Sequence, residues 1–239
     1  MVLAGCLDPA ALFGDTGPSL PEALLRSDPY PDLVVEIDHA PGRVPCAGSL
    51  AALEAVLLFA TGKRSVRVLA PTPMAAGDGD YDNAELARLH ADAADSGPAT
   101  GFGRGDAAYL HIVYLNGHAE SRNGGHAAGR TLYQQGALFV FPDAFESAYE
   151  IRAGFRSDAS CAAERAVLLH ELGHAFGLVN RGIPMLHDRE ADDHAGHSTN
   201  PASVMYPTLR IAADGRVLTP LPTAFDANDL ADLAAYRAG

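Results

Sequence analysis

Runs of apolar residues separated by turn-forming residues divide the chain into strands and helices. Short runs rich in branched and aromatic side chains predict strands, because such residues favour the pleated, half-buried surface of a sheet. These runs are residues 33–37, 65–69, 108–115 and 137–141. Longer segments with apolar residues three and four positions apart predict helices. They are residues 49–60, 84–94, 161–176 and 225–233, with Ser49, Ser160 and Asp226 as expected caps.

The order of these elements predicts an α+β fold. Strand, helix and strand come first, further strands follow, and the long helix at 161–176 comes after them. A glycine-rich polar stretch, residues 124–135, has the character of an edge strand. We therefore expect a twisted mixed sheet with a backing helix and a second, long helix, followed by a smaller irregular lower subdomain after Gly177.

Composition favours one globular domain preceded by a tether. Of the 239 residues, 48% are hydrophobic, which is enough for a sizeable core. Residues 7–32 carry prolines and glycines among polar residues, so we assign residues 1–32 to an irregular lead and residues 33–239 to the domain. The expected subdomains are about 33–177 (upper) and 178–239 (lower).

Charge excludes several classes of partner. Seventeen basic residues against thirty acidic ones give a formal net charge of −13. No basic cluster interrupts this acidic background, so nucleic acid and anionic membrane surfaces are not expected partners. No run of about 20 uncharged apolar residues predicts a membrane span.

The cysteines are Cys6, Cys46 and Cys161, and none forms a CxxC pair, which excludes a cysteine-built zinc site. Cys46 and Cys161 form either one disulfide or two small core residues, and the sequence leaves both open. Residues 3–6, Leu-Ala-Gly-Cys, resemble the end of a truncated bacterial lipoprotein signal. That resemblance implies a lipid anchor at Cys6 and a location in the bacterial cell envelope, or secretion. A chance match in an Ala-, Leu- and Gly-rich chain is the alternative.

The strongest chemical signal is His-Glu-Leu-Gly-His at residues 170–174, on the long predicted helix. His170 and His174 are four residues apart, so both imidazoles project from one face, as two ligands of one zinc ion must. Zinc lowers the pKa of bound water towards ~7, and a nearby carboxylate can remove the proton. Glu171 is the candidate for that carboxylate. The alternative is that His-Glu-x-x-His occurs here by chance.

Two further residues extend this motif. Gly177 follows His174 by three residues, and Val-Met-Tyr-Pro occupies residues 204–207. With them the chain resembles the metzincin clan of zinc peptidases, whose motif is HExxHxxGxxH or HExxHxxGxxD followed by a methionine-containing turn. The resemblance implies a metzincin-like fold, Zn²⁺ as cofactor, and Met205 as a structural floor beneath the metal. It also implies that Tyr206 stabilises the oxyanion, for which a packed core tyrosine is the alternative.

The sequence departs from the clan motif at the third zinc ligand, because Asn180 stands where the clan has histidine or aspartate. In the archaemetzincin branch, the third histidine precedes two cysteines and the turn methionine at a fixed spacing. His197 and Met205 keep that spacing, with Ser198 and Ser203 in place of the cysteines. The resemblance thus points to His197, after an extra loop at residues 181–196. The rival ligands are His187, His194, Asn180 and Glu190.

These observations predict a zinc metallopeptidase that holds zinc by His170, His174 and His197 and uses Glu171 as general base. A peptide or protein substrate would lie extended along the edge at 124–135. A non-catalytic zinc-binding or partner-binding envelope lipoprotein of the same fold is the second hypothesis, and hydrolysis of another amide is the third. The lone residues His111, His118 and His126 are expected at the surface or rim. Asp188, Asp192 and Asp193 are expected in a solvated acidic loop, for which calcium binding is the alternative.

Overall fold

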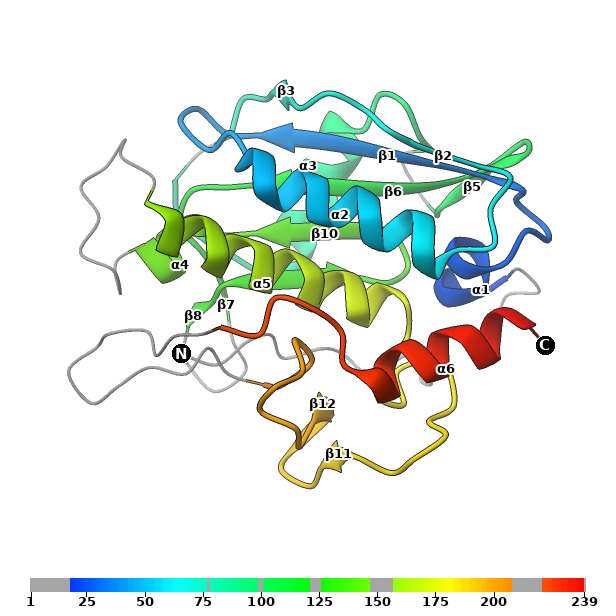
Figure 1. Ribbon diagram of the computed structural model, residues 1–239. Coiled ribbons are helices and arrows are strands. Elements are labelled where there is room, and N and C mark those ends of the chain that lie inside the picture. Colours follow the sequence, from blue (N-terminus) through cyan, green and yellow to red (C-terminus); the bar gives the residue numbers. More distant parts are fainter. Residues whose placement is uncertain are drawn as a thin grey trace.

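A mixed sheet forms the centre of the computed structural model, which describes residues 18–76, 78–98, 101–120, 126–146, 157–207 and 221–238. Its strands lie in the order β2-β1-β6-β10-β9 (Figure 1). The first four are parallel and β9 is antiparallel at the edge. Their bounds are β1 Asp32–His39, β2 Ser65–Val68, β6 Ala107–Tyr114, β9 Gly129–Leu132 and β10 Ala137–Val140.

Short strands extend this sheet and form two smaller ones. β3 (Thr72–Pro73) pairs with β1, and β5 (Gly103–Arg104) pairs with β6. The first small sheet contains β4 (Asp80–Tyr81), β7 (His118–Glu120) and β8 (His126–Ala127). The second is a hairpin of β11 (Glu190–Ala191) and β12 (His194–Ser198). The sequence predicted the main strands to within about two residues, and the α+β class is confirmed.

Helices cover both faces of the central sheet, which explains the long apolar runs of its strands. α2 (Ala47–Ala60) and α5 (Asp158–Ala175) lie together on one face, and α3 (Asn83–Ala93) lies behind the sheet in Figure 1. Successive side chains of a strand point to opposite faces. Leu33, Val35 and Ile37 of β1 therefore point to one side, and Glu36 and Asp38 to the other. All five are buried.

The prediction of an irregular lead over residues 1–32 is wrong for residues 20–25. Leu20–Leu25 form α1, whose leucines are buried in the core. Pro21 lies at the start of this helix, where proline is tolerated because the first N–H groups have no partner within the helix. The Lys63 ammonium donates to the carbonyl of Ala23 within α1 and to the carbonyls of Arg26 and Tyr30 after it. Residues 1–17, with Cys6 and its predicted lipid anchor, lie outside the described residues.

Two predicted helix caps are also wrong. α5 begins at Asp158, and its cap is Ser157, whose hydroxyl accepts from the Ser160 N–H at 3.1 Å. α2 begins after Cys46, and Ser49 is buried within its first turn. At the C-terminus, α6 (Ala227–Ala238) begins as predicted, because Asp226 accepts from two backbone N–H groups of its first turn. The short α4 (Pro142–Glu146) precedes α5. Across the described ranges, no helix has the length and apolarity needed to cross a membrane.

A disulfide joins Cys46 to Cys161 and settles the alternative that the sequence left open. Cys46 caps α2 and Cys161 lies in the first part of α5, with a Cα–Cα distance of 5.8 Å. The bond spans 115 residues of chain. It therefore fixes the N-terminal ends of the two helices on this face of the sheet to each other.

Replacing both cysteines, Cys46→Ser with Cys161→Ser, should lower the free energy of unfolding by about 4 kcal/mol, because the loop that the bond closes in the unfolded chain is long. Denaturant unfolding under non-reducing conditions measures the change. Cys6→Ser is the control and should leave the midpoint unchanged. Equal midpoints for the double variant and the parent would contradict the stabilising role.

Candidate metal centre

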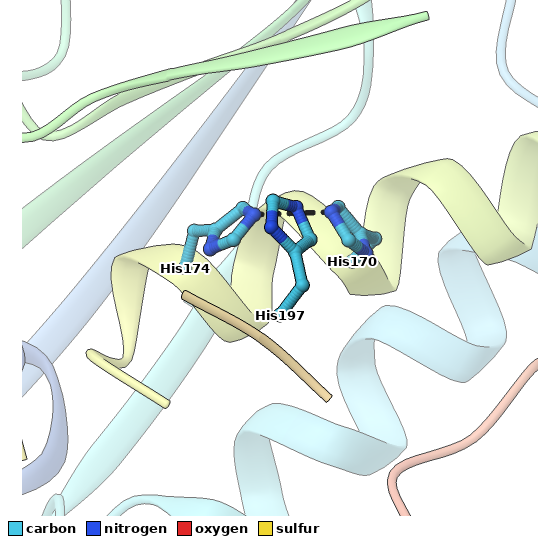
Figure 2. Close-up of side chains that lie close together, drawn as sticks. All are labelled: His170, His174 and His197. Carbon is cyan, nitrogen blue, oxygen red and sulfur yellow. Dashed lines mark hydrogen bonds between the residues drawn. The ribbon is translucent and has the colours of Figure 1, made fainter. Parts of the chain in front are cut away.

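Helix α5 places His170 and His174 one turn apart, with their rings directed at a common point (Figure 2). Their Nε2 atoms are 3.0 Å apart, and both side chains are fully buried. The leucines and valine around them anchor this part of the helix in the core. The local geometry is thus the one that the four-residue spacing predicts.

Gly177 ends α5 and turns the chain back beneath it. Its N–H donates to the His174 carbonyl (2.8 Å), and the Leu178 N–H donates to the Gly173 carbonyl (3.0 Å). These two bonds and the φ of +78° at Gly177 form a Schellman motif, in which glycine has no Cβ to strain. The next residues include Asn180, which is exposed and donates to Glu190 at 3.3 Å.

The hairpin β11–β12 brings His197 to the two helical histidines. The ligand nitrogens of His170, His174 and His197 all lie within 4.8 Å of one another. In Figure 2 the His197 ring enters between the other two from the segment below α5. The structure thus places His197 with the two helical histidines, and its role as the third zinc ligand stays a prediction. His197 lies on β12, and the expected loop at 181–196 contains the first strand of the hairpin.

The rival ligands lie elsewhere. His187 is exposed. His194 Nδ1 is 2.9 Å from the Asp193 carboxylate, and Glu190 accepts from the Gly196 N–H at 2.5 Å. Within the ranges that the structure describes, none of them joins the histidine triad.

Hydrogen bonds to carbonyl oxygens orient the rings for metal binding. His170 Nδ1 donates to the Val204 carbonyl (2.8 Å), and His197 Nδ1 is 3.2 Å from the carbonyls of His194 and Ala195. Because a carbonyl can only accept, Nδ1 carries the proton and Nε2 presents its lone pair to the centre. Burial lowers the pKa of His170 to about 4 and of His197 to about 3, and lowers the pKa of His174 well below its usual value. All three rings are neutral, which is the ligand form.

Glu171 lies beside the triad, and the edge strand β9 holds it. Its Oε2 accepts from the Thr131 hydroxyl at 2.7 Å. A Cβ at Gly129 would lie 2.5 Å from Glu171 Oε1, so only glycine leaves room for the carboxylate. Burial raises the pKa of Glu171 to about 7, although the bond from Thr131 and the charge of Arg130 act in the opposite direction.

Unpartnered buried atoms test whether a metal ion fits. Glu171 Oε1, His174 Nδ1 and His197 Nε2 have no hydrogen-bond partner among the described residues. An unsatisfied buried polar atom costs about 1–3 kcal/mol. A cation shared by the three Nε2 atoms, with a water next to Glu171, would satisfy Glu171 Oε1 and His197 Nε2 and leave His174 Nδ1 without a partner. The donor set of three neutral imidazoles with an open fourth position is that of catalytic zinc sites.

Met205 lies directly beneath the motif. A Cβ at Gly173 would be 2.2 Å from its sulfur and 2.9 Å from the Phe225 ring, so the helix and the turn touch closely at this glycine. The Ser198 N–H donates to the Met205 carbonyl at 2.8 Å, which links the turn to the strand of His197. Tyr206 follows and is half-buried; its role in oxyanion stabilisation stays a prediction.

A buried polar network connects this turn to α6. Ser203 Oγ donates to Asp229 at 2.6 Å and accepts from the Met205 N–H at 2.9 Å. Arg189, at the start of the hairpin, forms ion pairs with Asp229 (2.8 Å) and Asp232 (2.7 Å). Burial raises the pKa of Asp229, whereas the bonds from Ser203 and Arg189 lower it. The network sets the hairpin, and hence His197, relative to α5.

Comparison with solved structures identifies the class of this fold. The fold is similar to that of a zinc-dependent peptidase from Methanocorpusculum labreanum, with a TM-score of 0.51 and 16% identity over 84% of this chain and 99% of that one.

Archaemetzincins are also similar. The one from Archaeoglobus fulgidus, complexed with malonate, gives a TM-score of 0.45 and 11% identity over 84% and 99% of the two chains. That from Methanopyrus kandleri gives 0.45 and 16% over 86% and 94%. No model of a known protein family matches the chain, and no curated protein matches its sequence.

Sequence reasoning missed the residues that support the centre. Gly129 and Thr131 fell in a stretch recognised only as a polar edge, and a small residue followed by a hydroxyl two positions later was the available signal. Arg189, Asp229 and Asp232 belong to segments far apart along the chain. Their pairing requires the tertiary fold.

Gly173→Ala should destabilise the protein by about 1–3 kcal/mol, because the new methyl overpacks against Met205 and Phe225. This loss should exceed the gain of about 1 kcal/mol that alanine usually brings to a helix. Gly48→Ala is the matched control in α2, since its Cβ would meet only Arg165 Nη2 at 3.4 Å. Thermal unfolding measures both; a Gly173→Ala variant as stable as Gly48→Ala would refute the close contact.

His197→Ala should lose one equivalent of zinc relative to the parent, at a free zinc concentration that saturates the parent, because only two imidazoles remain at this centre. His194→Ala, three residues away on the same strand, should keep it. Metal content after dialysis against buffered zinc measures both. Loss of zinc in His194→Ala with retention in His197→Ala would reverse the assignment.

Proposed function

We propose that the protein is a zinc-dependent metallopeptidase in which His170, His174 and His197 hold the metal and Glu171 is the general base. One observation carries the proposal: three imidazoles converge, and Glu171, the next residue after His170, has a buried carboxylate oxygen without a hydrogen-bond partner among the described residues. A purely structural zinc site has four protein ligands and no use for such a carboxylate. The similarity of fold to a zinc-dependent peptidase supports the same proposal.

Glu171 transfers protons in the proposed reaction. When bound, zinc supplies Lewis-acid polarisation of the substrate carbonyl and acidifies the attacking water. Glu171 Oε1 accepts the proton of that water and later delivers it to the leaving amine. A pKa of about 7 suits both directions of transfer, because neither the acid nor the base form is then strongly favoured. Thr131 holds the other oxygen and so fixes the direction of Oε1.

The substrate in this proposal is an extended peptide or protein segment near β9. β9 ends the order of the described strands in the central sheet, and its Gly129 and Thr131 both adjoin Glu171. A peptide that pairs with an edge strand presents its carbonyls at regular spacing. This placement would bring one carbonyl to the metal.

The disulfide supports a location outside the cytoplasm. Disulfides persist in oxidising compartments and are rare among cytosolic proteins. We propose that the protein acts in the bacterial envelope or is secreted, in line with the Cys46–Cys161 bond. A non-catalytic zinc-binding or partner-binding protein of this fold is the alternative. Its zinc site would not need the Glu171 carboxylate.

Glu171→Gln should abolish cleavage of a mixed peptide library, by at least about 10²-fold, because the amide cannot accept the proton. Its zinc content should match the parent, since the three histidines are untouched. Mass spectrometry of the peptides and metal analysis of the protein measure the two quantities. Activity near the parent's with zinc present would exclude Glu171 as the base.

Thr131→Val should lower kcat by roughly 10- to 100-fold, the usual effect of removing a group that orients a catalytic one. Thr131→Ser keeps the hydroxyl and should retain most of the activity. KM should change little, because Thr131 acts on Glu171. Equal kcat values for the valine and serine variants would show that the hydroxyl does not position Glu171.

A further inference from the structure

A second buried cluster of ligand-type side chains lies on the other face of the central sheet, beneath α3. Glu36 and Asp38 come from β1, and His111 comes from β6. Glu36 and His111 are direct partners in the parallel register, so their side chains share a face. His90 of α3 covers them. The sequence predicted His111 at the surface or rim, which is wrong: it is 3% exposed.

The donor atoms of this cluster meet as closely as those of the histidine triad. One atom each from Glu36, Asp38 and His111 lies within 4.8 Å of the other two, and all three residues are buried. His111 Nε2 is 3.0 Å from Asp38 Oδ2. Around a tetrahedral zinc ion, donors about 2.0–2.2 Å from the metal are about 3.4 Å apart. Small side-chain rotations would therefore close the three donors on one ion.

Charge balance also points to a cation. Two carboxylates are buried here, and among the described residues neither pairs with Lys or Arg. Asp38 accepts from the Thr72 hydroxyl, and Glu36 accepts from the backbone N–H groups of Asp95 (3.0 Å) and Ser96 (3.1 Å). Burial raises the pKa of Glu36, and with both carboxylates ionised even a protonated His111 leaves one negative charge uncompensated in a medium of low dielectric. A divalent ion offsets both carboxylates.

The contact with His90 fits a ligand histidine. His90 Nδ1 lies 2.9 Å from His111 Nδ1, so one ring donates to the other. With a metal on His111 Nε2, His111 Nδ1 carries the proton and donates to His90, as a metal-bound imidazole usually does through its other nitrogen. His90 is 2% exposed, and its Nε2 has no hydrogen-bond partner among the described residues. A small hollow of about 10 Å³ lined by Glu36, His90, His111, Tyr109 and Gln135 adjoins the cluster.

We propose that Glu36, Asp38 and His111 bind a divalent transition-metal ion such as Zn²⁺ or Mn²⁺, with His90 orienting the His111 ring. A mixed set of carboxylates and imidazole suits these ions. The hollow has room for about one water ligand. The ion would tie β1 to β6 and, through His90, to α3, and it would be distinct from the metal of the proposed active site across the sheet.

Zn²⁺ and Mn²⁺ titration of the metal-stripped His170→Ala/His174→Ala variant tests this directly, because the second site is then the principal site left. Calorimetry should give one equivalent of at least one of the two ions, and that ion should raise the unfolding temperature. Adding Glu36→Gln and Asp38→Asn should remove both effects while circular dichroism shows a folded protein. If these changes prevent folding, His111→Gln with the same measurements replaces them.

A folded His170→Ala/His174→Ala variant that binds neither ion would overturn the proposal. So would binding that survives folded Glu36→Gln/Asp38→Asn or His111→Gln variants. Failure of the proposed peptidase function is distinguishable, because it shows as an inactive parent protein in the cleavage assay. That outcome leaves the one-equivalent binding measurement unaffected.

Discussion

Burial of three converging imidazoles and of the neighbouring Glu171 carboxylate is the constraint on which the proposed metal centre depends. Among the described residues, three polar atoms of this set have no hydrogen-bond partner: Glu171 Oε1, His174 Nδ1 and His197 Nε2. Such atoms are costly unless something satisfies them. A shared zinc ion with one water would satisfy Glu171 Oε1 and His197 Nε2. The carbonyls of Val204 and of residues 194–195 set the imidazole tautomers, and Thr131 fixes the carboxylate.

The part of the chain after Gly177 supplies the third histidine, and hydrogen bonds and ion pairs hold it in place. The Schellman turn at Gly177 sends the chain under α5, and the hairpin returns with His197. Ser203, Asp229 and Arg189 link the turn of Met205, the C-terminal helix and the hairpin. Buried ion pairs of this kind contribute geometric specificity more than net stability. Their role here is to place one imidazole opposite two others.

The sequence predicted those features that depend on short spacing. The four-residue interval fixes His170 and His174 on one helical face, and apolar runs locate β1, β6 and β10. The sequence could not predict features that depend on contacts between segments far apart along the chain. Prolines suggested a tether at α1, although Pro21 merely begins a helix whose leucines fill the core. His111 looked like a lone strand histidine because its acidic neighbours lie 73 and 75 positions away. The sequence pointed to His197 only through a resemblance in spacing. It did not predict the hairpin β11–β12 that brings His197 to the two helical histidines.

Anomalous scattering at the zinc absorption edge, from crystals of the zinc-loaded protein, tests the central claim most directly. The account predicts a peak about 2.0–2.1 Å from the Nε2 atoms of His170, His174 and His197, with a water as fourth ligand next to Glu171. A peak that excludes His197, or a zinc ion whose fourth ligand is a protein side chain in place of water, would contradict it.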